Sequence, residues 1–385
     1  MNKPSTPLWL LIALMMFPQL VETIYSPALP GIASHFSVSE ARAAQTLSIY
    51  FLAFAGGVVL WGRLSDILGR RPAMLLGLLC YGAGAALAMC AADFEQLLLA
   101  RVVSALGAAV GSVVTQTMLR DSYKQQALAR VFALMGAALA LSPVLGLFSG
   151  GLLAERYGHQ GVFCALLMLA LLLWGLCWRK LGETRPAQTD NSPLLPLAGQ
   201  MLRDASLWRN AGLVALFNTM LFSYYSLAPF LFAQLGWNAR QFGWSGATLA
   251  LATLLGSLLN RRLLQQGWQP QRLIRMACRL ALLSGCAVWA IGGSAWLLLP
   301  MMGVVVAFGI AIPNVLSQAL QNYRAAAGSA GALFGLGYYL LLSLGLALAG
   351  LAQQLGMVLA LAAALAMLCQ WRQSRPAAQP AGRMR

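Results

Sequence analysis

Long apolar runs recur along the whole chain, and this recurrence is the feature that most constrains its fold. A helix needs about 20 apolar residues to cross a hydrocarbon core of roughly 30 Å. Only 9% of the 385 residues are charged, against about 25% in soluble domains. We therefore predict an all-α membrane protein with twelve transmembrane helices. The predicted spans are 8–29, 43–63, 73–92, 96–118, 129–152, 161–179, 209–233, 241–262, 272–293, 296–320, 327–350 and 352–371.

The distribution of basic residues predicts how these spans are oriented. Cytoplasmic loops of membrane proteins hold an excess of Lys and Arg. With the N-terminus in the cytoplasm, 22 of the 26 basic residues fall on that side, whereas Arg42, Arg156 and Arg240 fall outside and Arg101 lies within a span. Both termini are thus predicted to be cytoplasmic. The net charge of +16 follows from this sorting beside anionic lipid, so it indicates no nucleic-acid partner.

A polar stretch divides six spans from six. The predicted organisation is an N-terminal six-helix bundle (1–180), a cytoplasmic linker (181–206), a C-terminal six-helix bundle (207–371) and a cytoplasmic tail (372–385). A weak internal echo supports two halves, because Gly62-x-x-x-Asp66 corresponds to Gly256-x-x-x-Asn260. Two parallel repeats of six spans are typical of transporters that rock around a site between the halves.

The loop after the second span reads WGRLSDILGRRP, residues 61–72. This segment resembles the G-x-x-x-D-x-x-G-R-R signature of the major facilitator superfamily, with Ile67 where a basic residue is usual. Further segments are similar to its drug:proton antiporter branch, especially the bicyclomycin and chloramphenicol resistance group. They are IYSPALP (24–30), LSIYFLAFAGGVVLWG (47–62), ARVVSALGAA (100–109) and LGETRP (181–186). The resemblance implies the major facilitator fold and proton-coupled export of antibiotics.

The loop signature predicts a conformational latch on the cytoplasmic side. Gly62 and Gly69 would allow tight helix approach and a turn, and Asp66 would cap a neighbouring helix or pair with arginine. The other predicted members of the latch are Arg70, Arg71, Arg120 and Asp121. In the fifth span, ALSPVLGLFSGGLL carries the antiporter packing motif of the resembled branch with Leu147 in place of a second proline. Its predicted packing residues are Pro143, Gly146, Gly150 and Gly151.

Glu22 is the one acid of ten that the predicted spans place well inside the membrane. A carboxylate at that depth costs about 2.5 to 3.5 kcal/mol on insertion scales, so such residues usually mark a proton or ion path. Arg101 lies at a similar predicted depth, where the two residues could pair or share a cavity. Because arginine does not release its proton, Glu22 is the predicted titrating member of this proton-coupling pair.

Polar and aromatic residues of the central spans are candidates for a broad amphipathic cavity. They are Gln19, Tyr25, Tyr50, Phe54, Gln116, Asn218, Tyr224, Tyr225, Asn314 and Gln318. The sequence holds no catalytic triad, P-loop or Cys/His cluster, so we predict no enzyme, no metal site and no cofactor beyond the proton gradient.

The predicted function is proton-coupled multidrug export by a monomeric antiporter of a bacterial inner membrane, with a small molecule and protons as partners. Export of a dedicated metabolite, such as a metallophore, sugar or amino acid derivative, is the alternative. A proton symporter for uptake, an intramembrane enzyme and an ion channel fit the pattern less well.

Overall fold

The computed structural model describes residues 6–123, 125–186 and 194–371. Within these ranges the regular structure is helical throughout, in agreement with the predicted all-α class. The predicted tail 372–385 and part of the predicted linker, 187–193, lie outside the described residues. The first half of the chain forms α1 (Leu8–Tyr25), η1 (Ser26–Ala28), α2 (Leu29–His35), α3 (Glu40–Leu68), α4 (Arg70–Met89), α5 (Phe94–Ser122) and α6 (Gln125–Lys180).

The second half begins after a short amphipathic helix that the sequence did not predict. This helix, α7 (Leu194–Arg203), lies within the predicted linker. The remaining elements are α8 (Ala205–Gln234), α9 (Ala239–Gln265), α10 (Pro270–Ile291), η2 (Ala295–Leu297), α11 (Leu298–Ala319), η3 (Gln321–Ala326), α12 (Ala327–Ala352) and α13 (Leu355–Trp371).

The predicted number of membrane spans agrees with the helices of the described residues. Ten helical segments are long and apolar enough to cross a membrane, and Leu355–Gln370 is a shorter apolar helix. One of the ten, Arg130–Lys180, comprises two arms of α6, because Gly158 has the non-helical angles φ 63° and ψ −164°. Ten segments, one of them double, and the shorter helix together give twelve spans.

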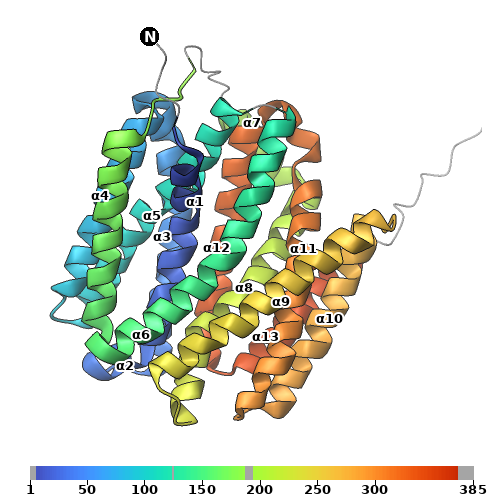
Figure 1. Cartoon of the computed structure of the whole chain (residues 1–385). Coiled ribbons are helices and arrows are strands. Elements are labelled where there is room, and N and C mark those ends of the chain that lie inside the picture. Colours follow the sequence, from blue (N-terminus) through green and yellow to red (C-terminus); the bar gives the residue numbers. More distant parts are fainter. Residues whose placement is uncertain (1–5, 124, 187–193, 372–385) are drawn as a thin grey trace, which may run out of the picture.

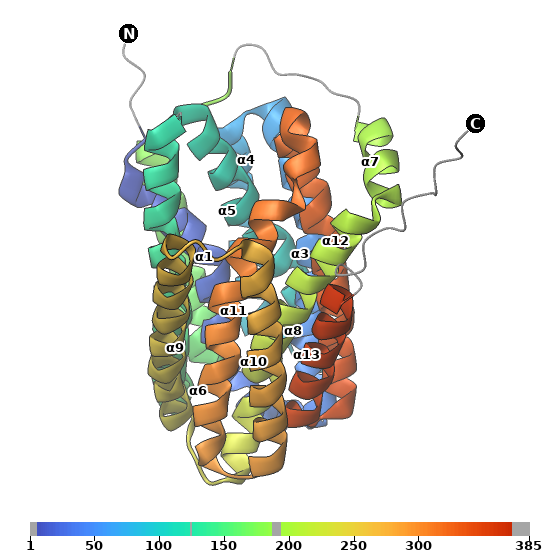
Figure 2. The same ribbon diagram turned by 90° about the vertical axis from the view of Figure 1, so that its right-hand side faces the viewer.

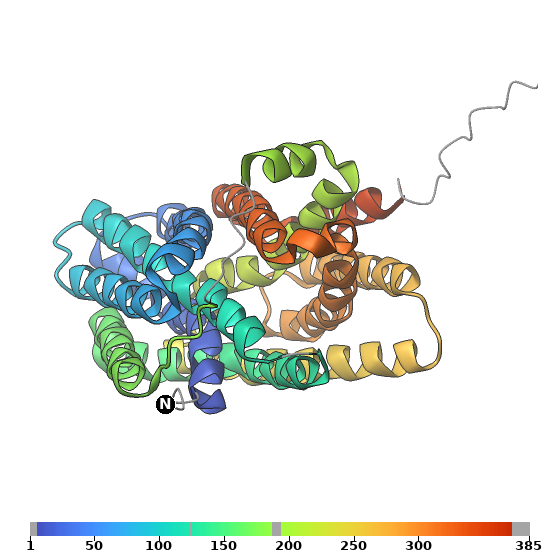
Figure 3. The same ribbon diagram turned by 90° about the horizontal axis from the view of Figure 1, so that it is seen from above.

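The helices stand side by side as a bundle with two distinct ends (Figure 1). We call the end at which α1 begins, near α7, the basic end, and the opposite end, near α2, the far end. Viewed along the bundle, α3, α4 and α5 gather on one side and α10, α12 and α13 on the other (Figure 3). The two halves meet along two seams, where α3 packs against α12 and α6 against α9.

Candidate functional site

Glu22 lies in α1 with 6% of its surface exposed. The helical path continues past α1 through η1 and α2 to His35, beyond the predicted end of the span at residue 29. Glu22 is therefore deep within the bundle, as predicted, rather than hydrated at its surface. Within the described residues its carboxylate has no hydrogen bond and no ion pair.

Arg101 of α5 is 1% exposed and stacks between two tyrosines. Its guanidinium carbon lies 4.1 Å from the ring centroid of Tyr25 and 4.3 Å from that of Tyr50. This sandwich gives two cation–π contacts, each worth about 2 kcal/mol when desolvated. Two of its donors, Nε and Nη2, have no hydrogen-bond partner among the described residues. Arg101 and Glu22 interact electrostatically without forming an ion pair, so they share a region rather than a direct contact.

Buried tyrosines of both halves interact electrostatically with the carboxylate of Glu22. In the first half, its charge acts on Tyr50 of α3 and Tyr81 of α4. In the second half, the same charge acts on Tyr225 of α8 and on Tyr338 and Tyr339 of α12. Buried tyrosine hydroxyls usually find a hydrogen-bond partner, yet those of Tyr50 and Tyr81 have none in the described part of the chain. Both hydroxyls are buried with unused hydrogen-bonding capacity.

Aromatic contacts join the two halves in the same region. The rings of Phe51 and Phe222 have centroids 4.6 Å apart, and those of Phe54 and Tyr339 are 4.9 Å apart. The sequence interpretation included Tyr25, Tyr50, Phe54 and Tyr225 but missed the tyrosines of α4 and α12. The adjacent tyrosines of α12 repeat the Tyr-Tyr pattern of α8, and this signal could have revealed them.

Several predicted cavity residues instead direct their polar atoms to other partners. Tyr224 donates to Ser245 Oγ at 2.7 Å, which joins α8 to α9. The amides of α11 also bond to neighbouring helices. Asn314 donates to Asn260 Oδ1 at 2.6 Å, and Gln318 accepts from Gln271 at 3.0 Å. These three predicted residues connect helices within the second half.

The remaining predicted candidates are half-buried amides on central helices. The side-chain amide of Gln19 makes no hydrogen bond to the described residues. Asn218 Nδ2 donates to Val214 O at 2.8 Å, one turn earlier in α8. Gln116 Nε2 lies 3.5 Å from Ser112 Oγ, also one turn earlier. All three stay candidates for contact with a substrate.

At the basic end, Arg70 connects three helices of the first half. Its Nη1 lies 2.5 Å from Asp66 Oδ1 of α3, and its Nε lies 3.0 Å from Asp121 Oδ2 of α5. The Arg70 side chain is only 5% exposed, whereas that of Asp66 is 46% exposed. Desolvation strengthens such charge-assisted bonds, so the bond to Asp121, which is 13% exposed, is expected to be the stronger one.

Glu183 caps the N-terminus of α4, the role that the sequence interpretation offered to Asp66. Its Oε1 accepts from the backbone N–H of Arg70 at 2.9 Å, and its Oε2 accepts from that of Arg71 at 3.1 Å. Burial tends to raise the pKa of this carboxyl, but backbone N–H donors, including that of Arg185, hold the pKa below the ordinary value of 4.5. Glu183 is the functional residue of this network that sequence reasoning missed.

Gly69 makes this cap possible. Its φ of 104° is in a region that favours glycine, and a Cβ there would lie 2.5 Å from Glu183 Oε2. Gly62 is different, because a Cβ there would meet Val113 at 3.7 Å, an ordinary contact distance. The packing of α3 against α5 in this conformation therefore does not require a glycine at position 62.

The other predicted members of the latch lie at the edge of the network. Arg71 Nη2 donates to Trp178 O at 2.7 Å. Arg120 is exposed and has no ion pair among the described residues. The network thus consists of Asp66, Arg70, Asp121 and Glu183, and we call it the basic-end network.

The predicted packing motif of α6 lies at the far-end contacts of this helix. Added Cβ atoms at Gly146 and Gly150 would overlap Thr23 and Ile24 of α1, so these glycines let α6 approach α1 closely. A Cβ at Gly151 would lie 2.6 Å from Ala239 O of α9, across the seam between the halves. Small residues at such contacts are typical of helix packing in lipid.

The structure also shows where the two proline positions of the packing motif lie. Leu147, which stands for the second proline, is fully buried and packs against Gly243 and Gly246 of α9. Pro143 lies inside the first arm of α6.

The far end is the closed end of the seam between the halves. Within the described ranges, four residue pairs hydrogen-bond across the halves: Ser26 with Tyr225, Glu40 with Gln234, Ser48 with Ser343, and Glu155 with Asn238. All four lie nearer the far end. At the basic end no hydrogen bond or ion pair joins described residues of the two halves, and Figure 2 shows the helices spreading there.

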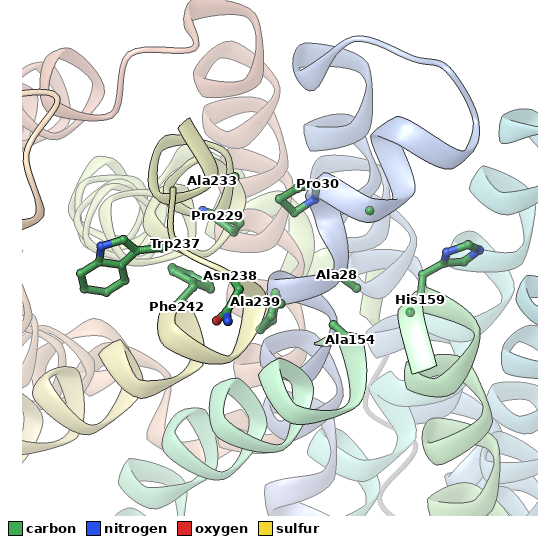
Figure 4. A pocket seen from close by; sticks show the side chains of 13 residues that line it. Ala28, Pro30, Ala154, His159, Pro229, Ala233, Trp237, Asn238, Ala239 and Phe242 are labelled. Atoms are coloured by element: carbon green, nitrogen blue, oxygen red, sulfur yellow. The ribbon is translucent and has the colours of Figure 1, made fainter. Parts of the chain in front are cut away.

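A cavity of about 230 Å³ lies at the far end between α2, α6, α8 and α9 (Figure 4). Its walls include Pro30 and His159 from the first half and Pro229 and Phe242 from the second. None of the predicted substrate-contacting residues lines it.

Comparisons with known proteins agree with this architecture. Residues 10–349 match the Major Facilitator Superfamily. An uncharacterized transporter of Rickettsia bellii is 32% identical over 353 residues, which cover 88% of this chain and 87% of the relative. Multidrug resistance protein D of Escherichia coli is 26% identical, with 94% of each chain covered.

Among solved structures, a D-xylose-proton symporter superposes with a TM-score of 0.75 at 15% identity, over 95% of this chain and 96% of that one. This likeness shows the fold alone. The family predicted from the loop signature is confirmed, and so is the expectation of a transporter rather than an enzyme. The chain belongs to the Major Facilitator Superfamily of membrane transporters.

Proposed function

We propose that this transporter exports small amphipathic compounds, antibiotics among them, in exchange for protons. The proposal places it as a monomer in a bacterial inner membrane, with the basic end in the cytoplasm. The observation that carries the proposal is Glu22, a buried carboxylate without a bonded partner, between the halves and close to Arg101. The name of the multidrug resistance relative supports the substrate class.

Exchange follows from competition at Glu22. A proton and a substrate that prefers the ionised carboxylate each lower the affinity of the other, and this coupling is reciprocal. Protons from the acidic outer side would neutralise Glu22 and release substrate there. Loss of the proton to the cytoplasm would then restore the charged site. The tyrosines that interact with Glu22 supply apolar faces and hydroxyls suited to amphipathic molecules.

The orientation is part of the proposal and rests on the basic residues. With the basic end in the cytoplasm, the hydrogen-bonded far end is external, so this conformation faces inward. A reporter that is active only in the cytoplasm should be active after Gln200 and silent near Ser37. The reverse pattern would overturn the orientation.

The test of function uses inverted vesicles with an imposed pH gradient and a panel of cationic and neutral antibiotics. Wild-type protein should accumulate substrate when the gradient is present, and added substrate should release protons. Glu22→Gln preserves shape without charge, so it should fold but lose both activities. Glu95→Gln removes an exposed carboxylate near the far end, paired with Arg42, and should retain both activities.

Two outcomes would change the proposal. Normal proton coupling in Glu22→Gln would show that this residue is not the coupling site. Gradient-dependent movement of one metabolite, without any antibiotic, would favour a dedicated exporter, and movement of substrate together with protons would favour a symporter.

A further inference from the structure

A groove between α10 and α13 opens toward the basic end, away from the tyrosines that interact with Glu22. Near the far end the two helices touch closely, because a Cβ at Gly285 would lie 2.9 Å from the backbone N of Ala360. Toward the basic end they leave a cavity of about 450 Å³, within the range of roughly 300 to 1,000 Å³ typical of small-molecule sites. The groove is therefore wedge-shaped.

The walls of the groove are apolar and its rim is cationic. Leu282 of α10 and Met367 and Leu368 of α13 line the walls, and Arg275 and Arg279 lie along one edge. The arginines are four residues apart on one face of α10, with a rise between them of about 6 Å. Both are exposed, and neither side chain has an ion pair or hydrogen bond among the described residues.

Gln370 adds an unsatisfied amide to the same groove. Gln370 is 4% exposed and lines the cavity, and its side chain makes no hydrogen bond to the described residues. Two free guanidinium groups and this amide together provide donors for one anionic oxygen-rich group.

We propose that this groove binds one anionic phospholipid, with the phosphate between Arg275 and Arg279 and an acyl chain along the apolar walls. The assignment of the inner leaflet rests on the proposed orientation, but the binding itself does not depend on export. Basic pockets between transmembrane helices on the cytoplasmic side are suited to anionic lipid headgroups. The groove faces the bilayer, where an amphipathic anion is the ligand that complements both of its surfaces.

Charge also argues against the chain's own tail as the occupant. Residues 372–385 include four arginines and no Asp or Glu. Like charges would therefore disfavour its docking against Arg275 and Arg279.

The test measures binding of phosphatidylglycerol and of phosphatidylcholine with matched acyl chains to the purified full-length protein in detergent, by native mass spectrometry. Wild type should bind one phosphatidylglycerol more tightly than phosphatidylcholine. The double variant Arg275→Gln/Arg279→Gln should raise the Kd for phosphatidylglycerol about thirtyfold, from about 1 kcal/mol for each arginine. Its affinity for phosphatidylcholine should be unchanged.

The matched control is Arg261→Gln/Arg262→Gln, which removes the same charge at the same end but outside the groove. It should keep wild-type affinity, and an equal loss in both doubles would overturn the site in favour of unspecific attraction. Leu368→Trp fills the groove without changing charge and should also weaken phosphatidylglycerol binding. Retention of wild-type binding by this variant, or displacement of the lipid by inorganic phosphate at similar concentrations, would exclude the groove as a lipid site.

Discussion

A single methyl group at Gly151 should disfavour closure of the far end. In the closed seam, the added Cβ would lie 2.6 Å from Ala239 O and 3.1 Å from the Cα of Gly243. Both are backbone atoms of α9, so no side-chain rotation relieves the contact. Overpacking of this kind costs typically about 1 to 3 kcal/mol. If the seam separates when the far end opens, the ratio of open to closed molecules should rise by roughly 5- to 150-fold for Gly151→Ala.

The assay is a distance measurement between spin labels at Tyr157 and Leu235, exposed residues of opposite halves near the far end. Exposed cysteines Cys90, Cys164 and Cys286 are first replaced by alanine. Gly151→Ala should increase the population with long distances. The control is Gly175→Ala on the second arm of α6, where an added Cβ meets no atom within 4 Å. Identical distance distributions for Gly151→Ala and wild type would refute this reasoning.

Three further predictions concern the two charged regions. Arg101→Lys should lower stability by about 1 to 2 kcal/mol and impair transport, because an ammonium does not stack as a plane between Tyr25 and Tyr50. Unchanged thermal unfolding and unchanged transport would contradict this prediction. Glu183→Gln should lower stability at neutral pH by about 1 kcal/mol. Since the folded pKa of Glu183 is lowered, the stability that its carboxylate contributes is fully present above about pH 4.5 and is lost as the pH falls through the folded pKa. The unfolding curves of wild type and Glu183→Gln should therefore converge in acid. Asp121→Asn should destabilise more than Asp66→Asn in the same assay, because Asp121 is 13% exposed and Asp66 is 46% exposed.

The sequence was sufficient to predict the spans because their length and apolarity follow from the thickness of the bilayer. It also singled out Glu22, which lies buried in α1, since one acid within an apolar run has few explanations. Hydropathy does not determine which face of a span points inward. For this reason Tyr338 and Tyr339 were missed, and Asn314 was predicted to line a cavity although its amide bonds to Asn260.

Contacts between residues far apart in the sequence were the second limit of prediction from the sequence. Glu183 caps α4 from a position 113 residues after Arg70. Nothing in local sequence spacing indicates that contact, and Asp66, only four residues from Arg70, was the nearer choice for a cap. The glycines of α6 were predicted to pack closely, but only the three-dimensional arrangement distinguishes Gly150, which meets α1, from Gly151, which meets α9.

Two roles of the basic-end network, a brace within the first half and a latch between the halves, can be distinguished by experiment. All of its bonds, including that of Arg70 to Asp121, lie within the first half and the segment that follows it. In this conformation the network therefore braces α3, α4 and α5 as one unit and does not hold the halves together. Of the two carboxylates that pair with Arg70, Asp66 is the more exposed. A latch requires that residues of the second half reach Asp66 when the basic end closes. A brace alone predicts that Asp66→Asn changes only unfolding, by about 0 to 1 kcal/mol. A latch predicts that the same variant also slows transport and increases the population open at the basic end, so distances across that end decide between them.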